Sequence, residues 1–436
     1  MIKQNTIAPG AIPLVTPYSN DSFVPIVNVG GAVNGGADAF GRMRSSQPTN
    51  IFASSFEYDL QPLLFEPVTV TGGSLVHGNS DTPVNKTCAV LKTDGQANAS
   101  ITLTQIGINH YQPGKSQLIL MTFVLGTAVT GVRKRVGYFD ANDGCFLEQS
   151  SGVLKIVMRT SVDGSAGDTA YPQTEWNMDT MDGTGGAANP SGILLNLAKQ
   201  QIFFIQAQWL GAGKLIFGFD IDGVLVPVHH VNNANENGNS SPYMRTFNLP
   251  LRWELTSTAE SDATSFKAIC CAVDSEGGLT EEAGFDFSAN NGIAPIGVTT
   301  RRSILTIKPA TTFNSIANNI KYELLKLEIG CKTNDGLWEL IYDAALGGTP
   351  SFGAVNASSG MTKDVAGTSI TGGIVVDSGY ITAGTGSSRT AISKAITSKY
   401  PLAVSQAGVQ HSYTVAVTSF TGTCDAQASI TWKEIR

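Results

Sequence analysis

The sequence predicts an all-β protein: a jelly-roll-like antiparallel β-sandwich with long loops and an extended N-terminal arm. Only 14% of the 436 residues are charged, well below the usual quarter. The 47 glycines and 18 prolines supply the many turns of a chain built from short strands. Apolar and polar residues also alternate with a period of two in many short runs, which is the pattern of half-buried strands.

Residues 1–38 are expected to form the extended arm. Proline and glycine recur there between short apolar pieces, a composition that does not build a compact core alone. A frayed terminus is the alternative, but the apolar pieces are too hydrophobic for a free tail. We predict that the arm lies on its own domain or on a neighbouring subunit. The candidate assembly contacts on the arm and just after it are Phe23, Val24, Ile26, Val27, Phe40 and Arg42.

Residues 39–330 are expected to form the main β-sandwich, and residues 201–231 give its clearest strands. In the first run, Phe203 and Ile205 face one side while glutamines face the other, and the next run alternates in the same way. Asp222-Gly223 suits a two-residue type I′ turn, because glycine accepts positive φ. We therefore predict three antiparallel strands in a meander.

Residues 331–436 are expected to be a C-terminal β region that completes the same sandwich or packs on it, since no charged or proline-rich linker precedes them. Strict alternation predicts a strand over 426–433, which would hold the C-terminus in a sheet. Just before this region, the alternation slips at Leu324-Leu325 and predicts a β-bulge.

The net charge is −7 and the isoelectric point is near 5.3, so no general basic surface attracts nucleic acid. The dense basic cluster Arg133-Lys134-Arg135 is interpreted as a solvated strand end, because three charges neutralise few phosphates. We expect no nucleic-acid partner.

The six cysteines are scattered, with no Cys-x-x-Cys pair and no histidine at metal-ligand spacing, and we interpret them as buried free thiols. The chain begins with no secretory signal, and no apolar run approaches the ~20 residues of a membrane helix. We expect a soluble protein made in a cytoplasm, with no membrane partner, no metal and no cofactor.

No catalytic constellation is found. Asp140-Ala-Asn-Asp143-Gly144 resembles the start of a calcium loop, but its glycine comes one residue early and no glutamate closes it, which favours an Asx-type turn over a surface cation site. His229 and His230 are adjacent on a strand and should face opposite sides, at a sheet edge or an interface. Close sets of carboxylates such as a glycosidase needs are absent. We expect that the protein is not an enzyme.

The candidate exposed contacts for a ligand or a partner lie in two loops, at residues 159–192 and 232–242. Trp176 in the first loop offers an indole that could stack on a sugar or on another subunit; the alternative is that it plugs its own loop. The polar loop contributes Asn232, Asn233 and Asn235.

Two resemblances follow from local motifs. Trp209 with its glycine turn and the Asp222-Gly223 hairpin resemble the hairpins of concanavalin-like jelly-roll domains, which implies the fold and not sugar binding. Six further pieces, in the same order from residue 39 to 436, resemble a family of large β-rich virion structural proteins of tailed bacteriophages. They begin at Ala39-Phe-Gly-Arg-Met-Arg, Tyr111-Gln-Pro-Gly-Lys-Ser, Val136-Gly-Tyr-Phe-Asp, Trp176-Asn-Met-Asp, Gln208-Trp-Leu-Gly-Ala-Gly and Ser358-Ser-Gly-Met.

This second resemblance implies a non-enzymatic virion component, such as a head decoration or cement protein, a head fibre, or a tail- or neck-associated protein. Its expected partners are other virion proteins of the capsid, neck or tail, and further copies of itself, with a homotrimer favoured. Its expected location is the virion. The alternative function is a carbohydrate-binding or host-receptor-binding module that recognises a host surface glycan.

Overall fold

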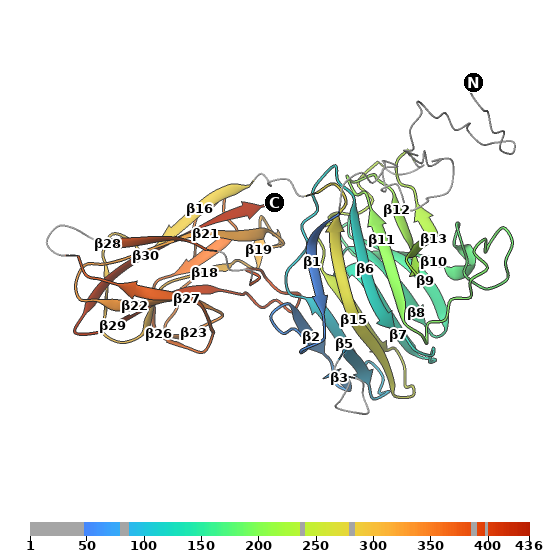
Figure 1. Cartoon of the computed structure of the whole chain (residues 1–436), viewed down its shortest axis with the longest axis horizontal. Helices are drawn as coiled ribbons and strands as arrows, with labels where there is room; N and C mark the ends of the chain where they lie inside the picture. The colour runs from blue at the N-terminus through green and yellow to red at the C-terminus, as the bar shows by residue number, and fades with distance from the viewer. Residues whose placement is uncertain (1–47, 79–86, 236–239, 279–283, 385–389, 397–399) are drawn as a thin grey trace, which may run out of the picture.

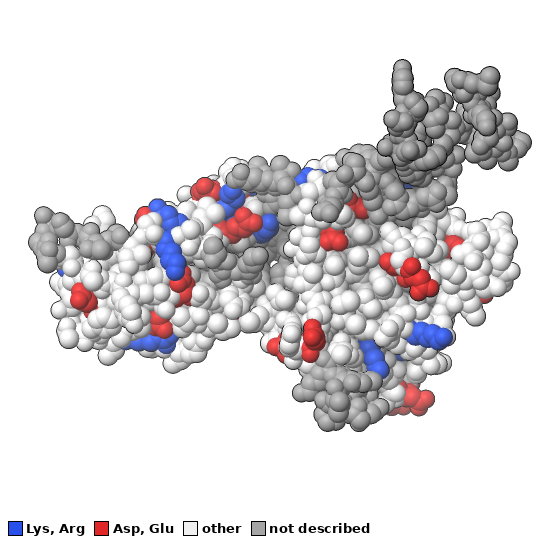
Figure 2. All heavy atoms as spheres, viewed as in Figure 1, with Lys and Arg blue, Asp and Glu red and all other residues white. Residues whose placement is uncertain are grey.

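The computed structural model describes residues 48–78, 87–235, 240–278, 284–384, 390–396 and 400–436. These residues form two antiparallel β-sandwiches that lie side by side along the long axis of the molecule (Figure 1). Uncharged residues make up most of the described surface visible in Figure 2, as the low charge content predicts. The predicted arm with Phe23, Val24, Ile26 and Val27, and the residues Phe40 and Arg42 just after it, lie outside the described residues.

The first sandwich consists of two facing sheets. Sheet I has the order β13-β12-β11-β6-β15-β4-β3, with β1 beside β15, and sheet II has the order β10-β9-β8-β7-β14-β5-β2. The strands of sheet I are β1 (Thr49–Ser55), β3 (Gly73–His77), β4 (Ala89–Thr93), β6 (Gln117–Val124), β11 (Gln201–Ala207), β12 (Leu215–Ile221), β13 (Val224–Val231) and β15 (Thr264–Ser275). Those of sheet II are β2 (Phe65–Thr69), β5 (Ser100–Gln105), β7 (Val132–Phe139), β8 (Gly144–Ser150), β9 (Val153–Thr160), β10 (Gly167–Pro172) and β14 (Leu251–Ser257).

The second sandwich also has two facing sheets. Sheet III has the order β16-β30-β21-β28, with β17 beside β30, and sheet IV has the order β24-β25-β18-β29-β22-β27. Sheet III consists of β16 (Phe285–Asn290), β17 (Ile296–Val298), β21 (Lys321–Cys331), β28 (Thr390–Ala395) and β30 (Cys424–Ile435). Sheet IV consists of β18 (Arg302–Pro309), β22 (Gly336–Tyr342), β24 (Gly353–Ala354), β25 (Met361–Asp364), β27 (Ile374–Ile381) and β29 (Tyr413–Ser419). The short pairs β19 (Thr312–Phe313) with β20 (Ile316–Ala317), and β23 (Ala345–Gly348) with β26 (Gly367–Thr371), and the 3-10 turn η1 (Gln173–Glu175) complete the described elements.

The chain passes repeatedly from one sheet to the other. In the second sandwich, β18, β22 and β29 lie in sheet IV, while β21, β28 and β30 lie in sheet III. This alternation between two antiparallel sheets is a jelly-roll-like arrangement, and it confirms the predicted fold class.

Each sandwich has its own hydrophobic core. Trp253 is buried in the first, where its ring makes edge contacts with Phe56 and Phe65 at centroid distances of 5.9 and 5.7 Å. Trp338 and Trp432 are buried in the second. Two separate cores mean that each sandwich buries enough apolar surface to be a domain.

The boundary between the sandwiches is not where the sequence analysis places it. The expected division at 330/331 falls at the end of β21, whereas the sheets divide between Ser275, the end of β15, and Phe285, the start of β16. The cause is a long-range pairing: β21 lies along the last strand, with Lys321 opposite Ile435 and Cys331 opposite Ala426. Residues 331–436 therefore complete a sandwich that begins at β16, and no composition change marks that start.

The predicted meander is confirmed as β11, β12 and β13, paired in sequence. Asp222 and Gly223 have φ values of 52° and 83°, as a type I′ turn requires. The predicted bulge is also confirmed, because the register of β21 against β30 shifts between Leu324 and Lys326. The C-terminal strand holds the chain end in sheet III, as expected.

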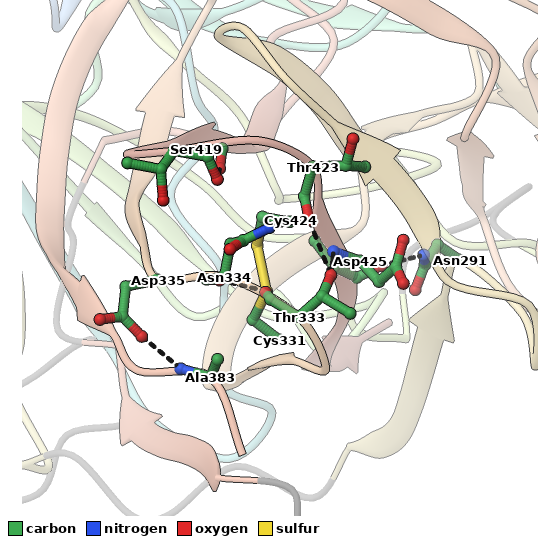
Figure 3. Close-up of a disulfide and its surroundings, with 12 residues drawn as sticks. Asn291, Cys331, Thr333, Asn334, Asp335, Ala383, Ser419, Thr423, Cys424 and Asp425 are labelled. Carbon is green, nitrogen blue, oxygen red and sulfur yellow. Dashed lines mark hydrogen bonds between the residues drawn. A yellow bond between two sulfur atoms is a disulfide. The ribbon is translucent and has the colours of Figure 1, made fainter. Parts of the chain in front are cut away.

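One expectation about cysteines is wrong. Cys331 and Cys424 form a disulfide that joins the end of β21 to the start of β30, with their Cα atoms 6.1 Å apart (Figure 3). Beside it, Thr333 donates to the carbonyl of Thr423 at 2.7 Å and accepts from the Asp425 N–H at 3.0 Å. The two cysteines are 93 residues apart in sequence, so only the pairing of their strands brings them together. Cys88, Cys145, Cys270 and Cys271 are free.

No helix among the described residues is long and apolar enough to cross a membrane.

Candidate functional site

Most of the ion pairs in the described part of the first sandwich lie on the outer face of sheet II. Along β7, Val132, Val136 and Tyr138 point into the core, so the residues between them point outward. The register continues this outward row across the neighbouring strands. We call the resulting surface the charged face. Its members are Arg133, Arg135 and Phe139 on β7, Phe146 and Glu148 on β8, Lys155 and Arg159 on β9, Asp168 on β10, and Arg252 and Glu254 on β14.

Glu254 lies at the centre of the charged face. Its carboxylate contacts the guanidinium groups of Arg252 at 2.9 Å, Arg133 at 3.2 Å and Arg135 at 3.3 Å. Because three guanidinium groups of the described chain share this carboxylate, positive charge locally exceeds negative charge.

Further ion pairs extend the network toward the edge of the sheet. Arg135 also donates to Glu148 at 2.6 Å, and Lys155 contacts the other oxygen of Glu148 at 3.0 Å. At the edge strand, Arg159 donates to both carboxylate oxygens of Asp168, at 2.7 and 2.9 Å. Such a bidentate pair has fixed geometry as well as charge.

Two phenylalanines lie beneath the guanidinium groups. The rings of Phe139 and Phe146 are buried, with centroids 4.4 Å apart. Arg135 and Arg159 lie over the Phe146 ring at 4.9 and 5.3 Å, and Arg252 lies over Phe139 at 5.1 Å. These cation–π contacts hold the guanidinium groups above the sheet.

Gly137 makes room for this layer. A Cβ at this position would lie 2.6 Å from the Cβ of Phe146, a distance that side chains do not tolerate. Glycine on the outer face of β7 therefore lets the Phe146 side chain lie against the neighbouring strand.

Glu254 and Asp168 on the charged face both have lowered pKa values. Burial acts to raise the pKa of Glu254, but Arg252, Arg135 and Arg133 outweigh it, and the pKa is lowered. Burial likewise acts on Asp168, but the hydrogen bond and charge of Arg159 prevail and lower its pKa. Both carboxylates are thus ionised near neutral pH.

The basic cluster is not the solvated strand end that the sequence analysis expects. It lies within β7, and Arg133 and Arg135 belong to the charged face. Lys134 points the other way and is buried, where its ammonium donates to the carbonyls of Leu125 at 2.5 Å and Thr127 at 3.1 Å. Burial lowers the pKa of Lys134 to about 8. Carbonyls and carboxylates of the protein accept from these cations.

The turn from β7 to β8 is the Asx-type turn that was predicted. Asp140 accepts from the N–H groups of Asn142 at 2.7 Å and Asp143 at 2.8 Å. Asp143 accepts from Arg245 and from Ser161. Both carboxylates thus have partners within the protein, and no group of three or more metal-ligating side chains was found in the described part of the chain.

Trp176, predicted as an exposed contact, is buried, with 4% of its surface exposed. The segment around it folds back on β13, where Met178 and Asp179 donate to the carbonyl of Val228. The indole therefore turns inward, and its N–H donates to the carbonyl of Tyr171 at 3.1 Å. Trp176 is therefore not an exposed contact; its ring belongs to the core of the first sandwich, with its centroid 6.5 Å from that of Phe219.

The three asparagines do not form a common surface with the charged face. They follow β13 of sheet I, whereas the charged face belongs to sheet II. Asn232 and Asn235 are exposed. Asn233 is buried and donates to the carbonyl of Gly213 at 2.8 Å. The structure therefore assigns Asn233 a role in holding the loop.

His229 and His230 face opposite sides of β13, as predicted. His229 is buried against the Tyr171 ring at a centroid distance of 4.5 Å and accepts from the Asn177 N–H at 3.3 Å. Burial, with the neighbouring His230, lowers its pKa to about 4. β13 is an edge strand of sheet I, and the segment containing Asn177 covers it by exchanging hydrogen bonds with the backbone of His230.

The charged face was missed at the sequence level although a signal existed. Arg133/Arg135 and Arg252/Glu254 are spaced two residues apart on strands, so each pair lies on one face. The signal that these strands are neighbours is absent from the sequence, because β7 and β14 are more than a hundred residues apart and pair as Arg135 opposite Glu254.

Apart from the charged face, a cavity between the two sandwiches is a candidate site. It is a cavity of about 560 Å³ with a mainly hydrophobic lining that includes Phe52, Leu64, Leu324, Tyr400 and Pro401. Its polar lining includes Asn50, Gln105, Asn109 and His110, and Lys321 and Glu323, which form an ion pair at 2.9 Å. The charged face is the stronger candidate for a functional site.

Neither a protein-family model nor a curated protein sequence matches the chain. Solved structures match about half of it. Among them are a legume lectin-like domain from Entamoeba histolytica (7% identity, 52% of this chain, 98% of that chain, TM-score 0.30) and the carbohydrate recognition domain of Emp47p (11%, 54%, 99%, 0.32). A third is a conserved carbohydrate esterase from Shiga toxin-encoding bacteriophage phi24B (9%, 52%, 99%, 0.30). At these values the similarity concerns the β-sandwich fold alone, and the resemblance to virion proteins stays a prediction.

Proposed function

We propose that the protein is a non-enzymatic carbohydrate-binding protein and that it binds a saccharide along the charged face of sheet II. The observation that carries this proposal is the row of fixed hydrogen-bonding groups on the outer face of sheet II, where the side chains of Arg133, Lys155 and Asp168 are 30%, 27% and 34% exposed. The partly exposed cations can donate and the Asp168 carboxylate can accept, and sugar hydroxyls can do both.

The dimensions of the face suit an oligosaccharide. Its residues come from five neighbouring strands of sheet II, which lie in the order β10, β9, β8, β7 and β14. Five strands cover about 20 Å, because neighbouring strands lie about 4.8 Å apart. The ion pairs and the phenylalanine layer already hold the side chains in place, so little side-chain freedom is lost on binding.

The charge states of Glu254 and Asp168 favour binding over hydrolysis. A glycosidase needs one carboxyl group with a raised pKa to protonate the leaving oxygen. Arg252, Arg135 and Arg133 instead lower the pKa of Glu254 against the effect of burial. Glu148 contacts Arg135 at 2.6 Å and Lys155 at 3.0 Å, so both of its oxygens already have cation partners.

The test is a glycan array followed by calorimetry with the full chain. Replacement of Arg252 by Ala should lower affinity for the bound glycan at least 10-fold, since a charge-assisted hydrogen bond contributes about 1.5–3 kcal/mol. The matched control is Arg301→Ala in the second sandwich, where Arg301 pairs with Glu339 at 2.7 Å. Equal binding by both variants would reject the charged face as the site.

A virion structural role is the second candidate, and one observation favours it. The edge strand β27 exposes Ile374, Val375 and Tyr380, and Tyr380 lies beside the exposed Phe420 at a centroid distance of 5.9 Å. An apolar edge strand suits contact with another subunit. In this setting the chain would assemble as a homo-oligomer, with a trimer favoured, among capsid, neck or tail proteins.

This candidate has its own tests. Deletion of residues 1–38 should abolish incorporation into particles while leaving glycan binding unchanged. Tyr380→Ser with Phe420→Ser should lower the solution mass measured by light scattering. A full-length protein that is a monomer at all concentrations would contradict the oligomer.

A further inference from the structure

The charged face has an excess of positive charge on a protein that is acidic as a whole. Its described residues comprise five cations (Arg133, Arg135, Lys155, Arg159 and Arg252) and three carboxylates (Glu148, Asp168 and Glu254), a difference of +2. The whole chain has a net charge of −7. Glu66, on β2 at the far edge of the same sheet, accepts from the Ala407 N–H of the second sandwich at 2.9 Å and lies apart from this cluster.

The carboxylates are held by the more deeply buried cations. Arg135, with 8% of its side chain exposed, binds both Glu148 and Glu254, and Arg159 binds Asp168. Asp168 is the exception in burial, because its side chain is 34% exposed, but Arg159 donates to both of its oxygens. An anionic ligand on this face therefore meets carboxylates that already have cation partners.

The cations that reach solvent lie around this buried centre. The exposed side-chain fractions are 30% for Arg133, 27% for Lys155 and 17% for Arg252. Arg133 and Arg252 make their ion pairs to the same carboxylate, that of Glu254, whose own side chain is only 8% exposed. Two partly exposed guanidinium groups thus share one nearly buried negative charge with Arg135.

A guanidinium group is planar and offers paired N–H donors that match the oxygens of a carboxylate or a sulfate. Arg252 is held over the Phe139 ring, which fixes the plane that it presents. Neutral sugar hydroxyls do not use this surplus of positive charge, whereas anionic groups along a saccharide do.

We propose that the charged face selects anionic saccharides, meaning glycans that carry carboxylate or sulfate groups, with Arg133, Lys155 and Arg252 as the residues that determine this selectivity. The inference rests on the proposed carbohydrate-binding function and names the ligand class for the same site. Nucleic acid is disfavoured because the chain has a net charge of −7 and three partly exposed cations neutralise few phosphates.

The experiment measures affinity of the full chain for three oligosaccharide probes of equal length by calorimetry: oligogalacturonate, a heparin oligosaccharide and a neutral maltooligosaccharide. Single-stranded DNA of matched charge is the fourth probe. We expect at least 10-fold tighter binding of one or both anionic saccharides than of the neutral one. The two anionic probes separate carboxylate from sulfate recognition. We also expect affinity to fall as salt concentration rises.

The key variant is Arg133→Gln with Arg252→Gln, which should lower anionic-saccharide affinity at least 10-fold. Arg301→Gln with Lys326→Gln, in the second sandwich, changes the net charge equally and should leave affinity unchanged. Arg252→Lys keeps the charge and loses the paired donors, so it should retain less than half of the wild-type affinity. Thermal melting verifies that each variant is folded.

The outcomes separate the two proposals. Equal binding of neutral and anionic saccharides, lost in the double variant, would overturn the selectivity and keep the function. Binding of no saccharide would overturn both. DNA binding as tight as that of the anionic saccharides, or a loss with the control variant equal to that with the key variant, would show a general charge effect and overturn the inference.

Discussion

The two sandwiches have related folds but are stabilised in different ways. In the described residues, Cys88, Cys145, Cys270 and Cys271 of the first sandwich are free, whereas both cysteines of the disulfide belong to the second. The first sandwich instead carries a network of ion pairs across the outside of sheet II. The first sandwich uses an outer face for fixed charge, and the second uses a covalent link between strands of sheet III.

The comparison teaches that a β-sandwich leaves its outer faces free to differ. In both sandwiches the core consists of alternating inward residues around buried tryptophans. Specific features lie outside the core: the charged face on sheet II, and the exposed apolar residues of β27 on sheet IV. We expect ligand binding to depend on the first sandwich and covalent stability on the second.

Removal of the disulfide should have the largest effect on stability. Cys331→Ser with Cys424→Ser opens a link between residues 93 positions apart, which the loop-entropy model values at about 4–5 kcal/mol. Differential scanning calorimetry should show a lower unfolding temperature for the second sandwich only. Cys270→Ser, in the first sandwich, is the control. A matching shift in both sandwiches would contradict independent stabilisation.

Replacement of the buried indole in the first sandwich should come next. Trp176→Ala removes a ring that contacts Phe219 and donates to Tyr171, and buried aromatic truncations cost about 3–5 kcal/mol. The unfolding transition of the first sandwich should move to lower temperature. Glycan affinity, measured well below that transition, should stay unchanged. Loss of glycan binding by a folded Trp176→Ala protein would restore the exposed-contact hypothesis.

Acid should weaken the first sandwich before the second. The pKa of His229 is lowered to about 4 by burial, below its unfolded value near 6.5. The unfolded state therefore binds more protons between these values, so stability is full above pH 6.5 and is lost as pH falls toward 4, by about 1 kcal/mol after allowance for solvent screening.

Urea unfolding at pH 7 and pH 5 measures this loss. Because His230, whose pKa is also lowered, acts in the same direction, His229→Gln should reduce the pH dependence without abolishing it. An unchanged pH dependence in His229→Gln would show that other groups cause it.

The smallest effect on stability is expected from the charged face itself. Arg252→Gln removes one partner of Glu254 while Arg133 and Arg135 remain, so the free energy of unfolding should fall by about 1 kcal/mol or less. Denaturant unfolding checks this value. A loss as large as that of the disulfide would indicate that the network is mainly structural.

Local sequence patterns were sufficient for elements whose pairing is local. The meander, its type I′ turn, the bulge after Leu324 and the C-terminal strand all follow from alternation and turn chemistry over a few residues. The strand Gly167–Pro172 was missed, because it is a largely exposed edge strand without an apolar stripe.

Features that depend on distant pairing were missed for a common reason. The start of the second sandwich, the Cys331–Cys424 link and the Arg135–Glu254 contact each need strands far apart in sequence to become neighbours. Pairing of this kind is decided by the packing of whole sheets and leaves no local signature. The burial of Trp176 likewise depends on a segment that folds over β13.

The most direct test of the account is hydrogen–deuterium exchange of the full chain with and without a bound anionic oligosaccharide. We predict added protection in β7, β8 and β14, which carry Arg133, Arg135, Glu148, Arg252 and Glu254, and none in sheets III and IV. Protection confined to the loop at 232–242 or to the second sandwich would contradict the placement of the site on sheet II.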